Sequence, residues 1–489
     1  MSRNPIACNS AKGLTQLARS PLSGISVCVV GAGPAGVYTA LQCWRKGHNV
    51  CILERSPVAR TQGDFFMIAP QVINHIKTWP DMAEENDRIA ADPRVSLHRN
   101  TGERISGPLA FRFDKGADAG AELDPTKRFH FHHRPKFLQM LISQLGRIGV
   151  QIEYGCRVAE FHEDADKAGV RLDDGRTIEA DVVVAADGIG TKSHTLVSGQ
   201  DIRAWPSRLA GFRAAFPVEM IAGGMPNSQS EQRFWTMVTP ISRFSMGQQG
   251  LHMTLMRTED IITWGMTHKD EGTASESWYE SVDPSTVLGY VSTIPTFPSF
   301  LRRLIEATPK DGIVDWKIMW RNPQPLTTSP LGRVVQVGDA AHTLLPSSMN
   351  GANQALEDAI YLASCLELGG KENVHWATKV HNKLRFERVS CCQKLGFVNL
   401  AKRTNRDAKT ANTKKTEDMV PEQGRWLWGH NPEMYVCDNF HKALDHLQRG
   451  TPFQNTNIPP GYVHEEWAVD ELMARVERNE PLNLGGDWS

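Results

Sequence analysis

Two apolar runs near the start of the chain are separated by a segment with helical spacing. Residues 25–30 and 49–53 form the runs, and the segment between them reaches Lys46-Gly47, where a glycine can end a helix. Strands that are almost wholly apolar are usually buried on both faces of a parallel sheet. This order of strand, helix and strand predicts a Rossmann-like α/β domain.

The pattern changes in the middle of the chain. Residues 209–216 and 251–256 alternate apolar with other side chains, which predicts strands of an antiparallel sheet. Residues 334–337 return to the pattern of a buried strand, and residues 371–489 read as mostly helical. We therefore expect an α/β fold in which a Rossmann-like domain is joined to an antiparallel-sheet domain and a helical C-terminal segment.

Composition and charge limit the kinds of molecule that the protein is expected to bind. The 489 residues suffice for two or three domains, and 54 Lys and Arg nearly balance 55 Asp and Glu. The net charge of −1 gives no overall field to attract nucleic acid or an anionic membrane, and no apolar run is long enough to cross a membrane. Nine cysteines without CxxC spacing favour free thiols and a cytoplasmic location. His130 and His132 would share a strand face, but no neighbouring cysteine or acid completes a set of ligands, so we expect no metal.

A glycine-rich turn follows the first apolar run. Gly31 permits the tight turn, Gly33 lets the backbone approach a pyrophosphate, and Gly36 lets helix and strand pack closely. Glu54 lies 23 residues after Gly31, a spacing at which an acid accepts hydrogen bonds from ribose hydroxyls. Because Glu54 would repel a 2′-phosphate, the motif favours FAD or NAD over NADP as the bound dinucleotide.

A second candidate site lies after residues 334–337. Asp339 follows this strand at its C-terminal end, where ligands bind in open α/β sheets. Gly351 then begins a helix, and a helix N-terminus offers unpaired N–H groups to an anionic centre such as a reduced flavin ring or a pyrophosphate. Asp339 could accept from ribityl or ribose hydroxyls, although aspartate also commonly forms turns at strand ends.

The motifs together resemble a known family. The Gly31–Gly36 turn with Glu54, the pair Asp187-Gly188, and the run Gly338-Asp339-Ala340-Ala341-His342 are similar in order and spacing to the three signatures of class A FAD-dependent aromatic monooxygenases, which include p-hydroxybenzoate and salicylate hydroxylases. The resemblance spans roughly residues 24–370. Residues 320–325 and 383–389 resemble the fungal secondary-metabolite branch of that family.

The resemblance implies a bound FAD and a transient NADPH. The residues that it assigns to FAD are Gly31, Gly33, Ala35, Gly36, Glu54, Arg55, Gly63, Arg134, Asp187, Asp339, Gly351 and Ala352. No second GxGxxG motif follows, as would be usual for a separate NADPH-binding Rossmann domain. This absence fits a family in which the flavin moves to meet NADPH.

These patterns predict that the chain is divided into five parts. Residues 1–23 have no continuous apolar stretch, so we expect a flexible N-terminal extension and no secretory signal. The FAD-binding domain is expected in two parts, residues 24–200 and 316–370. The substrate-binding β-sheet domain would occupy residues 201–315 between them, and the helical region residues 371–489.

Two residues are candidates for catalysis. Arg213 is a cation inside an apolar strand, where it could orient a phenolate or another oxyanion, or it could lie at a strand edge facing solvent. Asp64 lies in Gly63-Asp64-Phe65-Phe66, where the family often has Gly-Ala-Gly beside the flavin ring; it could be a carboxylate at the reaction centre or a solvated loop acid. Met349 likewise replaces a family glycine, and its side chain could shape the pocket or cap the loop.

The resemblance implies an NAD(P)H-consuming monooxygenase. Its flavin hydroperoxide would hydroxylate or epoxidise an electron-rich aromatic or indole-type substrate, such as a polyketide phenol or an indole alkaloid, with O2 as co-substrate. We expect a monomer or a homodimer. Two alternatives are a flavin-fold binding or regulatory protein without redox turnover, and a flavin oxidoreductase that does not insert oxygen.

Overall fold

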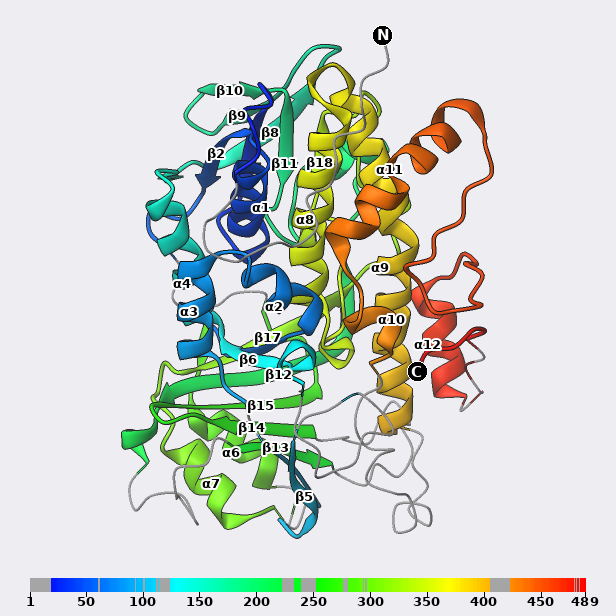
Figure 1. Ribbon diagram of the computed structural model, residues 1–489. Coiled ribbons are helices and arrows are strands. Elements are labelled where there is room, and N and C mark those ends of the chain that lie inside the picture. The colour runs from blue at the N-terminus through cyan, green and yellow to red at the C-terminus, as the bar shows by residue number, and fades with distance from the viewer. Residues whose placement is uncertain are drawn as a thin grey trace.

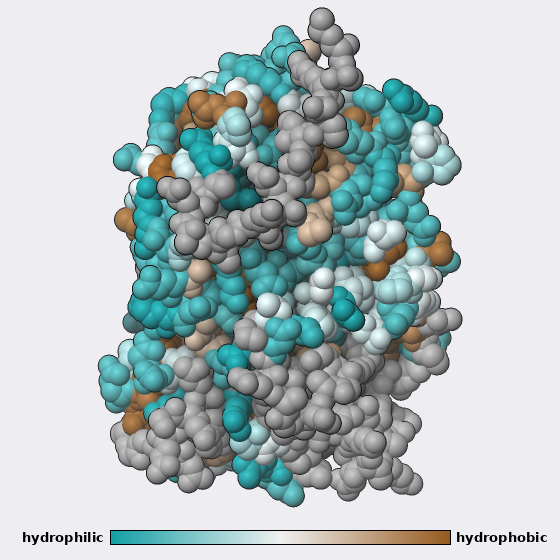
Figure 2. Space-filling view, viewed as in Figure 1, coloured by the Kyte–Doolittle hydropathy of each residue, from teal (hydrophilic) through white to brown (hydrophobic). Residues whose placement is uncertain are grey.

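The structure is a computed structural model with two layers, one built on a five-stranded sheet and the other on an eight-stranded sheet (Figure 1). It describes residues 19–59, 62–92, 94–99, 102–110, 113, 124–221, 233–238, 252–275, 280–292, 294, 297–404, 423–478, 480, 482 and 484–489. None of the helices in these ranges is long and apolar enough to span a bilayer. On the face drawn in Figure 2, hydrophobic residues form separate patches among hydrophilic ones.

The first layer is built on a five-stranded parallel sheet with strand order β18-β11-β1-β2-β7. Its strands are β1 (Ser26–Val30), β2 (Asn49–Glu54), β7 (Ile152–Tyr154), β11 (Val182–Ala185) and β18 (Val334–Gln336). The helices α1 (Pro34–Arg45), α4 (Arg134–Arg147) and α8 (Gly351–Gly369) cover one face, and a small sheet of β8 (Val158–Glu163), β9 (Ala168–Leu172) and β10 (Thr177–Ala180) covers the other.

Burial on both faces explains why β1 contains almost no polar residues. Val27 and Val29 contact the helical layer, whereas Cys28 and Val30 contact the small sheet. Successive side chains of a strand point to opposite faces, so each of these positions has to be apolar. The predicted Rossmann-like strand, helix and strand at residues 25–54 are confirmed.

The second layer is an eight-stranded sheet with strand order β16-β17-β12-β15-β14-β13-β4-β5. Its strands are β4 (Arg94–Arg99), β5 (Arg104–Ala110), β12 (Trp205–Pro217), β13 (Arg233–Val238), β14 (His252–Arg257), β15 (Ile261–Lys269), β16 (Ser281–Val282) and β17 (Ile313–Trp320). The helices α6 (Pro284–Ser292) and α7 (Ser299–Glu306) pack on it through one apolar cluster.

This sheet differs from the prediction in two respects. The strands β4 and β5 come from residues 94–110, inside the segment assigned to the FAD-binding domain, and β17 continues past the expected boundary at residue 315. In addition, β4 pairs with β13 in parallel, so the sheet is mixed where an antiparallel one was expected. An alternating pattern shows which residues face a core but does not identify the partner strand, and here the partners are over a hundred positions apart.

The prediction of a flexible extension over residues 1–23 is wrong for residues 19–23, which contact the rest of the chain. Ser20 donates its backbone N–H to the carbonyl of Arg45 (2.8 Å), and the guanidinium of Arg19 lies 4.4 Å from the ring centroid of Trp44. The carbonyls at the end of α1 have no partners within the helix, and this segment satisfies some of them. Residues 1–18 lie outside the described residues.

The remaining elements connect and cover the two layers. They are β3 (Phe65–Ile68), β6 (His130–His133), α2 (Pro70–Ile76), α3 (Pro80–Ile89), α5 (His194–Ser198), α9 (Val374–Thr404), α10 (Arg425–Trp428), α11 (Pro432–Arg449) and α12 (Val469–Glu477), with short 3-10 turns η1 (Pro125–Lys127), η2 (Val218–Met220), η3 (Gly338–Ala340), η4 (Pro346–Ser348) and η5 (Lys371–Asn373). The C-terminal region is helical, as expected, and α8 and α9 run side by side (Figure 1).

A fully buried ionic network joins α8, α9 and the C-terminal segment. Glu357 accepts from Arg385 (Nη1, 2.7 Å) and from Arg388 (Nε, 2.7 Å). Arg388 also donates to the carbonyls of Trp426 (3.0 Å) and Leu427 (3.0 Å). Although burial raises the pKa of Glu357, the two arginines lower it to about 2. The carboxylate is therefore ionised, and Arg388 fastens α10 to the buried side of α8.

Replacing Arg388 by methionine should strongly destabilise the fold. The variant removes one of the two arginines that pair with Glu357 and takes this donor from the carbonyls of Trp426, Leu427 and Asn457. Breaking a buried pair in this way costs about 3–5 kcal/mol. Chemical denaturation of the purified protein measures this loss. Arg449→Met is the matched control, because Arg449 is exposed on α11 and forms a surface ion pair with Asp445 at 3.2 Å. Equal stabilities of the two variants would contradict a structural role of the network.

Candidate active site

The glycine-rich turn forms one wall of a recess at the end of β1. Gly31 has φ +106°, and a Cβ at Gly31 or Gly36 would overlap backbone atoms of the turn or of the neighbouring strand. A Cβ at Gly33, in contrast, would meet no atom within 4 Å. Gly31 and Gly36 are thus required by the protein's own packing, whereas Gly33 borders open space at the start of α1, as a pyrophosphate site requires.

Glu54 is fixed at the end of β2. Its Oε2 accepts from the backbone N–H of Ala32 and its Oε1 from that of Ser56, both at 2.8 Å. Each oxygen keeps a lone pair, and the side chain is half-buried. The carboxylate is held beside the glycine-rich turn, where it can receive ribose hydroxyls. Ala35 lies in the first turn of α1, near Gly338.

Asp187 lies between the two walls of the recess. Burial raises its pKa to about 6, against the lowering influence of Thr191 and of the positive charges of Arg55 and Arg321. Its Oδ1 atom is buried and has no hydrogen-bond partner among the described residues. A buried acceptor of this kind calls for a donor from outside the protein chain, and the hydroxyl groups of a dinucleotide fit.

The second wall is the turn that contains Asp339. Arg321 is buried and donates through Nη2 to the carbonyls of Asp339 (2.6 Å) and Ala340 (3.2 Å). Asp358 binds the same turn at two points. Its Oδ2 accepts hydrogen bonds from Gly338 N–H (2.9 Å) and from His342 Nε2 (2.7 Å). The Asp339 residue is exposed at the end of β18, and desolvation by the surrounding protein raises the pKa of its carboxyl.

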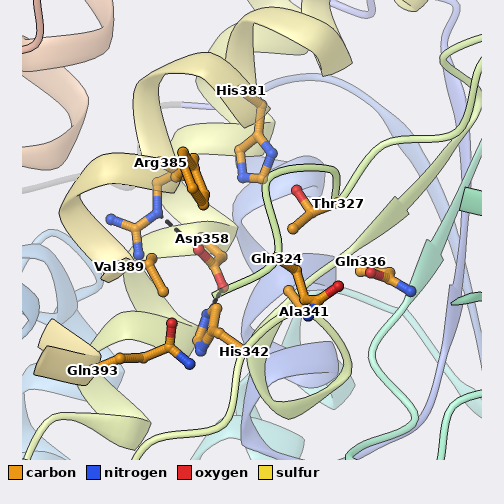
Figure 3. A pocket seen from close by; sticks show the side chains of 11 residues that line it. Gln324, Thr327, Gln336, Ala341, His342, Asp358, His381, Arg385, Val389 and Gln393 are labelled. Carbon is orange, nitrogen blue, oxygen red and sulfur yellow. Dashed lines mark hydrogen bonds and ion pairs between the residues drawn. The ribbon is translucent and has the colours of Figure 1, made fainter. Parts of the chain in front are cut away.

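A small cavity lies on the far side of this turn. Figure 3 shows His342, Asp358 and Arg385 joined in a line, with His381 and Gln336 across the cavity. Arg385 donates to Asp358 Oδ1 at 2.7 Å, and this charge together with His342 holds the pKa of Asp358 low against the effect of burial. The cavity therefore belongs to the structure that supports the turn.

The N-terminus of α8 faces the same recess. Its N-cap, Asn350, makes no side-chain cap bond, so the first N–H groups of the helix receive no cap from this side chain. A Cβ at Gly351 would meet no atom within 4 Å, so there is open space beside this residue. Asn353 fixes this end by accepting from Ala69 N–H (2.8 Å) and donating to the carbonyl of Met67 (3.2 Å). The free N–H groups and the helix dipole suit an anionic ring.

Gly63 and Arg134 lie at the edge of the recess. Gly63 has φ +143°, and a Cβ there would come within 2.9 Å of Arg134 Cδ, so the arginine lies directly against the glycine. Arg134 begins α4, its backbone N–H donates to the carbonyl of Asp64 (2.8 Å), and its Nη1 donates to the carbonyl of Gln62 (3.0 Å).

The two candidate catalytic residues form an ion pair. Arg213 lies on β12, and its Nε and Nη2 approach Asp64 Oδ2 at 2.6 and 2.5 Å. The Arg213 side chain is 30% exposed and that of Asp64 15% exposed. Neither residue is fully solvated, and the pair connects the loop beside Gly63 to β12 of the eight-stranded sheet.

Met349 adopts a backbone conformation that favours glycine. It has φ +56° and ψ +19° at the end of η4. Its side chain packs against an apolar interface cluster between the two layers. The buried members of this cluster are Met67, Ala69, Ala91, Phe129, Phe131, Met256 and Trp428, and Phe65 packs at its edge.

The sequence did not reveal Arg321, Asp358 or Asn353 as site residues. Arg321 lies in the segment 320–325, which the sequence linked only to a fungal branch. Asn353 and Asp358 lie on α8, where both are buried among apolar residues. These polar residues within a mostly apolar helix could have indicated the site, because buried polar groups in proteins are usually hydrogen-bonded to specific partners.

Comparison with known proteins agrees with these features. The FAD binding domain family matches residues 24–203 and 297–373, and so leaves out most of the second sheet. The FAD-dependent monooxygenase fsr3 of Gibberella fujikuroi is 40% identical over 486 residues, covering 97% of this chain and 91% of the relative. The FAD-dependent monooxygenase mdpD of Emericella nidulans is 39% identical over 487 residues, covering 96% and 92%.

Solved structures show the same fold. The crystal structure of CtdE with FAD and a substrate has a TM-score of 0.76 at 26% identity and covers 87% of this chain and all of that one. The structure of FqzB has a TM-score of 0.77 at 25% identity and covers 91% and 99%. This chain therefore belongs to the class A FAD-dependent monooxygenases, and FAD is its cofactor. The alternative of a binding protein without redox turnover is not supported.

Gly33→Ala should separate FAD binding from folding. The apoprotein should melt at the wild-type temperature or above it, because Gly33 has an extended backbone (φ −74°) and free space for a methyl group. Its FAD affinity should fall by about 5- to 150-fold, since a methyl group in the ligand's space costs about 1–3 kcal/mol. Thermal melting and flavin fluorescence titration measure the two effects.

Gly31→Ala is the matched control. It should destabilise the apoprotein itself, because the added Cβ would overlap the carbonyl of Ala186. If Gly33→Ala binds FAD as tightly as the wild type, the pyrophosphate does not lie at this turn.

Substitutions at Met349 should reveal backbone strain. Both Met349→Gly and Met349→Ala remove the same packing, but only glycine adopts φ +56° without penalty. We expect the glycine variant to be about 1 kcal/mol more stable than the alanine variant, the reverse of the usual order. Parallel denaturation curves measure the difference, and a more stable alanine variant would show that no strain is stored at Met349.

Proposed function

We propose that the protein is an NAD(P)H-consuming monooxygenase that hydroxylates or epoxidises an electron-rich aromatic or indole-type substrate in fungal secondary metabolism. The Asp64–Arg213 ion pair is the observation that supports this proposal most directly. It lies where the loop beside Gly63 and Arg134, residues assigned to FAD, meets the substrate sheet. When bound and reduced by NADPH, FAD supplies the activated oxygen that is transferred from O2.

The ion pair offers both a proton acceptor and a cation to the substrate. The Asp64 carboxylate can accept the proton of a phenol O–H or an indole N–H, which makes the ring more nucleophilic toward electrophilic oxygen. The Arg213 guanidinium remains charged and can stabilise the anion so formed. Because Arg213 is paired to Asp64 at 2.6 Å, the base and the cation are held together before substrate arrives.

The apolar interface cluster supports an aromatic substrate. Met256 on β14, Phe131 on β6 and Trp428 on α10 belong to this one cluster, with Met349 beside them. Such a wall excludes water from the site, and its methionines adapt to flat ring systems of different outline. We assign the members of this cluster that adjoin Met349 to the substrate pocket.

The function can be tested by screening aromatic and indole metabolites for faster NADPH oxidation by the yellow holoenzyme, followed by product mass analysis. A substrate should gain one oxygen atom for each NADPH consumed. Stimulated NADPH oxidation that yields only hydrogen peroxide would mean that the compound is not the substrate. A holoenzyme that transfers no oxygen to any compound which it binds would argue for an oxidoreductase that does not insert oxygen.

Arg213→Ala should lower coupled turnover on the order of a hundredfold, because the substrate anion and Asp64 both lose their cation. The flavin absorbance spectrum should be unchanged, since Arg213 lies on the substrate sheet. Product formed per NADPH consumed is the measurement. Arg203→Ala is the control, because Arg203 is 82% exposed and pairs with Asp201. Wild-type product formation in Arg213→Ala would leave this arginine with a structural role only.

A further inference from the structure

Two cysteines face each other on neighbouring strands of the FAD-binding sheet. Cys28 on β1 and Cys51 on β2 are direct partners in the parallel register. Neighbouring strands lie about 4.8 Å apart, within the Cα separation of roughly 4.4–6.8 Å that a disulfide spans. Directly paired residues also point their side chains to the same face of a sheet, so the two sulfur atoms can meet.

The two thiols differ in their access to solvent. Cys51 is exposed, whereas Cys28 is fully buried beside Leu53 and Cys156. A hydrogen bond between the two thiols raises the pKa of Cys28 and lowers that of Cys51. Cys51 is therefore the thiol that ionises first and meets an oxidant first, and Cys28 is the partner behind it.

We propose that Cys28 and Cys51 form a reversible disulfide site that responds to hydrogen peroxide. The Cys51 thiolate attacks peroxide and becomes a sulfenic acid while hydroxide leaves. The Cys28 thiol then attacks the Cys51 sulfur, the S–S bond forms, and the sulfenic oxygen leaves as water. The two thiols together give up two electrons and two protons, and one peroxide becomes two waters.

The bond would act on the nucleotide site. Cys28 lies three residues before Gly31, and Cys51 lies three residues before Glu54. A disulfide draws the two Cβ atoms to about 3.8 Å, closer than two parallel strands normally hold them, so both strands must twist toward each other. The turn and the carboxylate at the ends of these strands would shift, and FAD would be held less tightly. A strained disulfide is also easily reduced, which suits a reversible site.

Peptide mapping of the peroxide-treated holoenzyme tests the proposal. After treatment, alkylation and non-reducing trypsin digestion, residues 20–45 should appear joined to residues 47–55, with the loss of two hydrogens. Dithiothreitol should separate them. The join should be absent in Cys51→Ser and in Cys28→Ser, and present in Cys43→Ser, which removes the second cysteine of the longer peptide. FAD retained on a desalting column should fall in the oxidised wild type but not in oxidised Cys51→Ser.

Three results would overturn the proposal. One is that Cys51 ends as a sulfinic or sulfonic acid while Cys28 stays available to the alkylating agent after unfolding. Another is that Cys51 joins Cys156 or Cys43 in place of Cys28. The third is that the Cys28–Cys51 bond forms and FAD retention does not change, which would remove its proposed effect on the flavin site.

Discussion

The site depends on a group of buried charges on α8. Glu357 and Asp358 are adjacent in the helix, but their carboxylates bind different partners. Glu357 binds Arg388, which in turn binds the C-terminal segment. Asp358 binds the turn that contains Asp339. Arg385 lies between them and bonds to both. Removing one member takes a partner from at least one buried charge, so substitutions at these positions are expected to be coupled.

This arrangement explains how a recess can be assembled from distant segments. Its two walls come from the ends of β1 and β18, and its rim comes from the loop before β3 and from α4. Each wall is fixed by contacts within the chain. Close packing around Gly31 and Gly36 fixes the first wall, and hydrogen bonds to Arg321 and Asp358 fix the second. Because these contacts are made within the chain, they order both walls and so lower the entropy lost when a dinucleotide binds.

Sequence patterns predicted the parts of the protein that are local. The strand, turn and helix at residues 25–45 follow from apolar runs and glycines that act within one turn of chain. The pairing of β4 with β13, the contact of Asp64 with Arg213, and the hold of Arg321 on the Asp339 turn all join residues far apart in sequence. A single sequence shows that such residues could interact, but it does not show which of them come into contact, because tertiary packing determines the contacts.

The mixed second sheet has a consequence for how the chain reaches this structure. The paired strands β4 and β5 leave the ribosome early, yet β13, the other neighbour of β4, is made more than a hundred residues later. The first sheet gains its edge strand β18 only after the strands from β12 to β17 have been made. Neither layer can be completed before the other has largely been synthesised. Completion of the two sheets is therefore interdependent, and the edge of β4 that pairs with β13 stays without its strand while the residues between them are made.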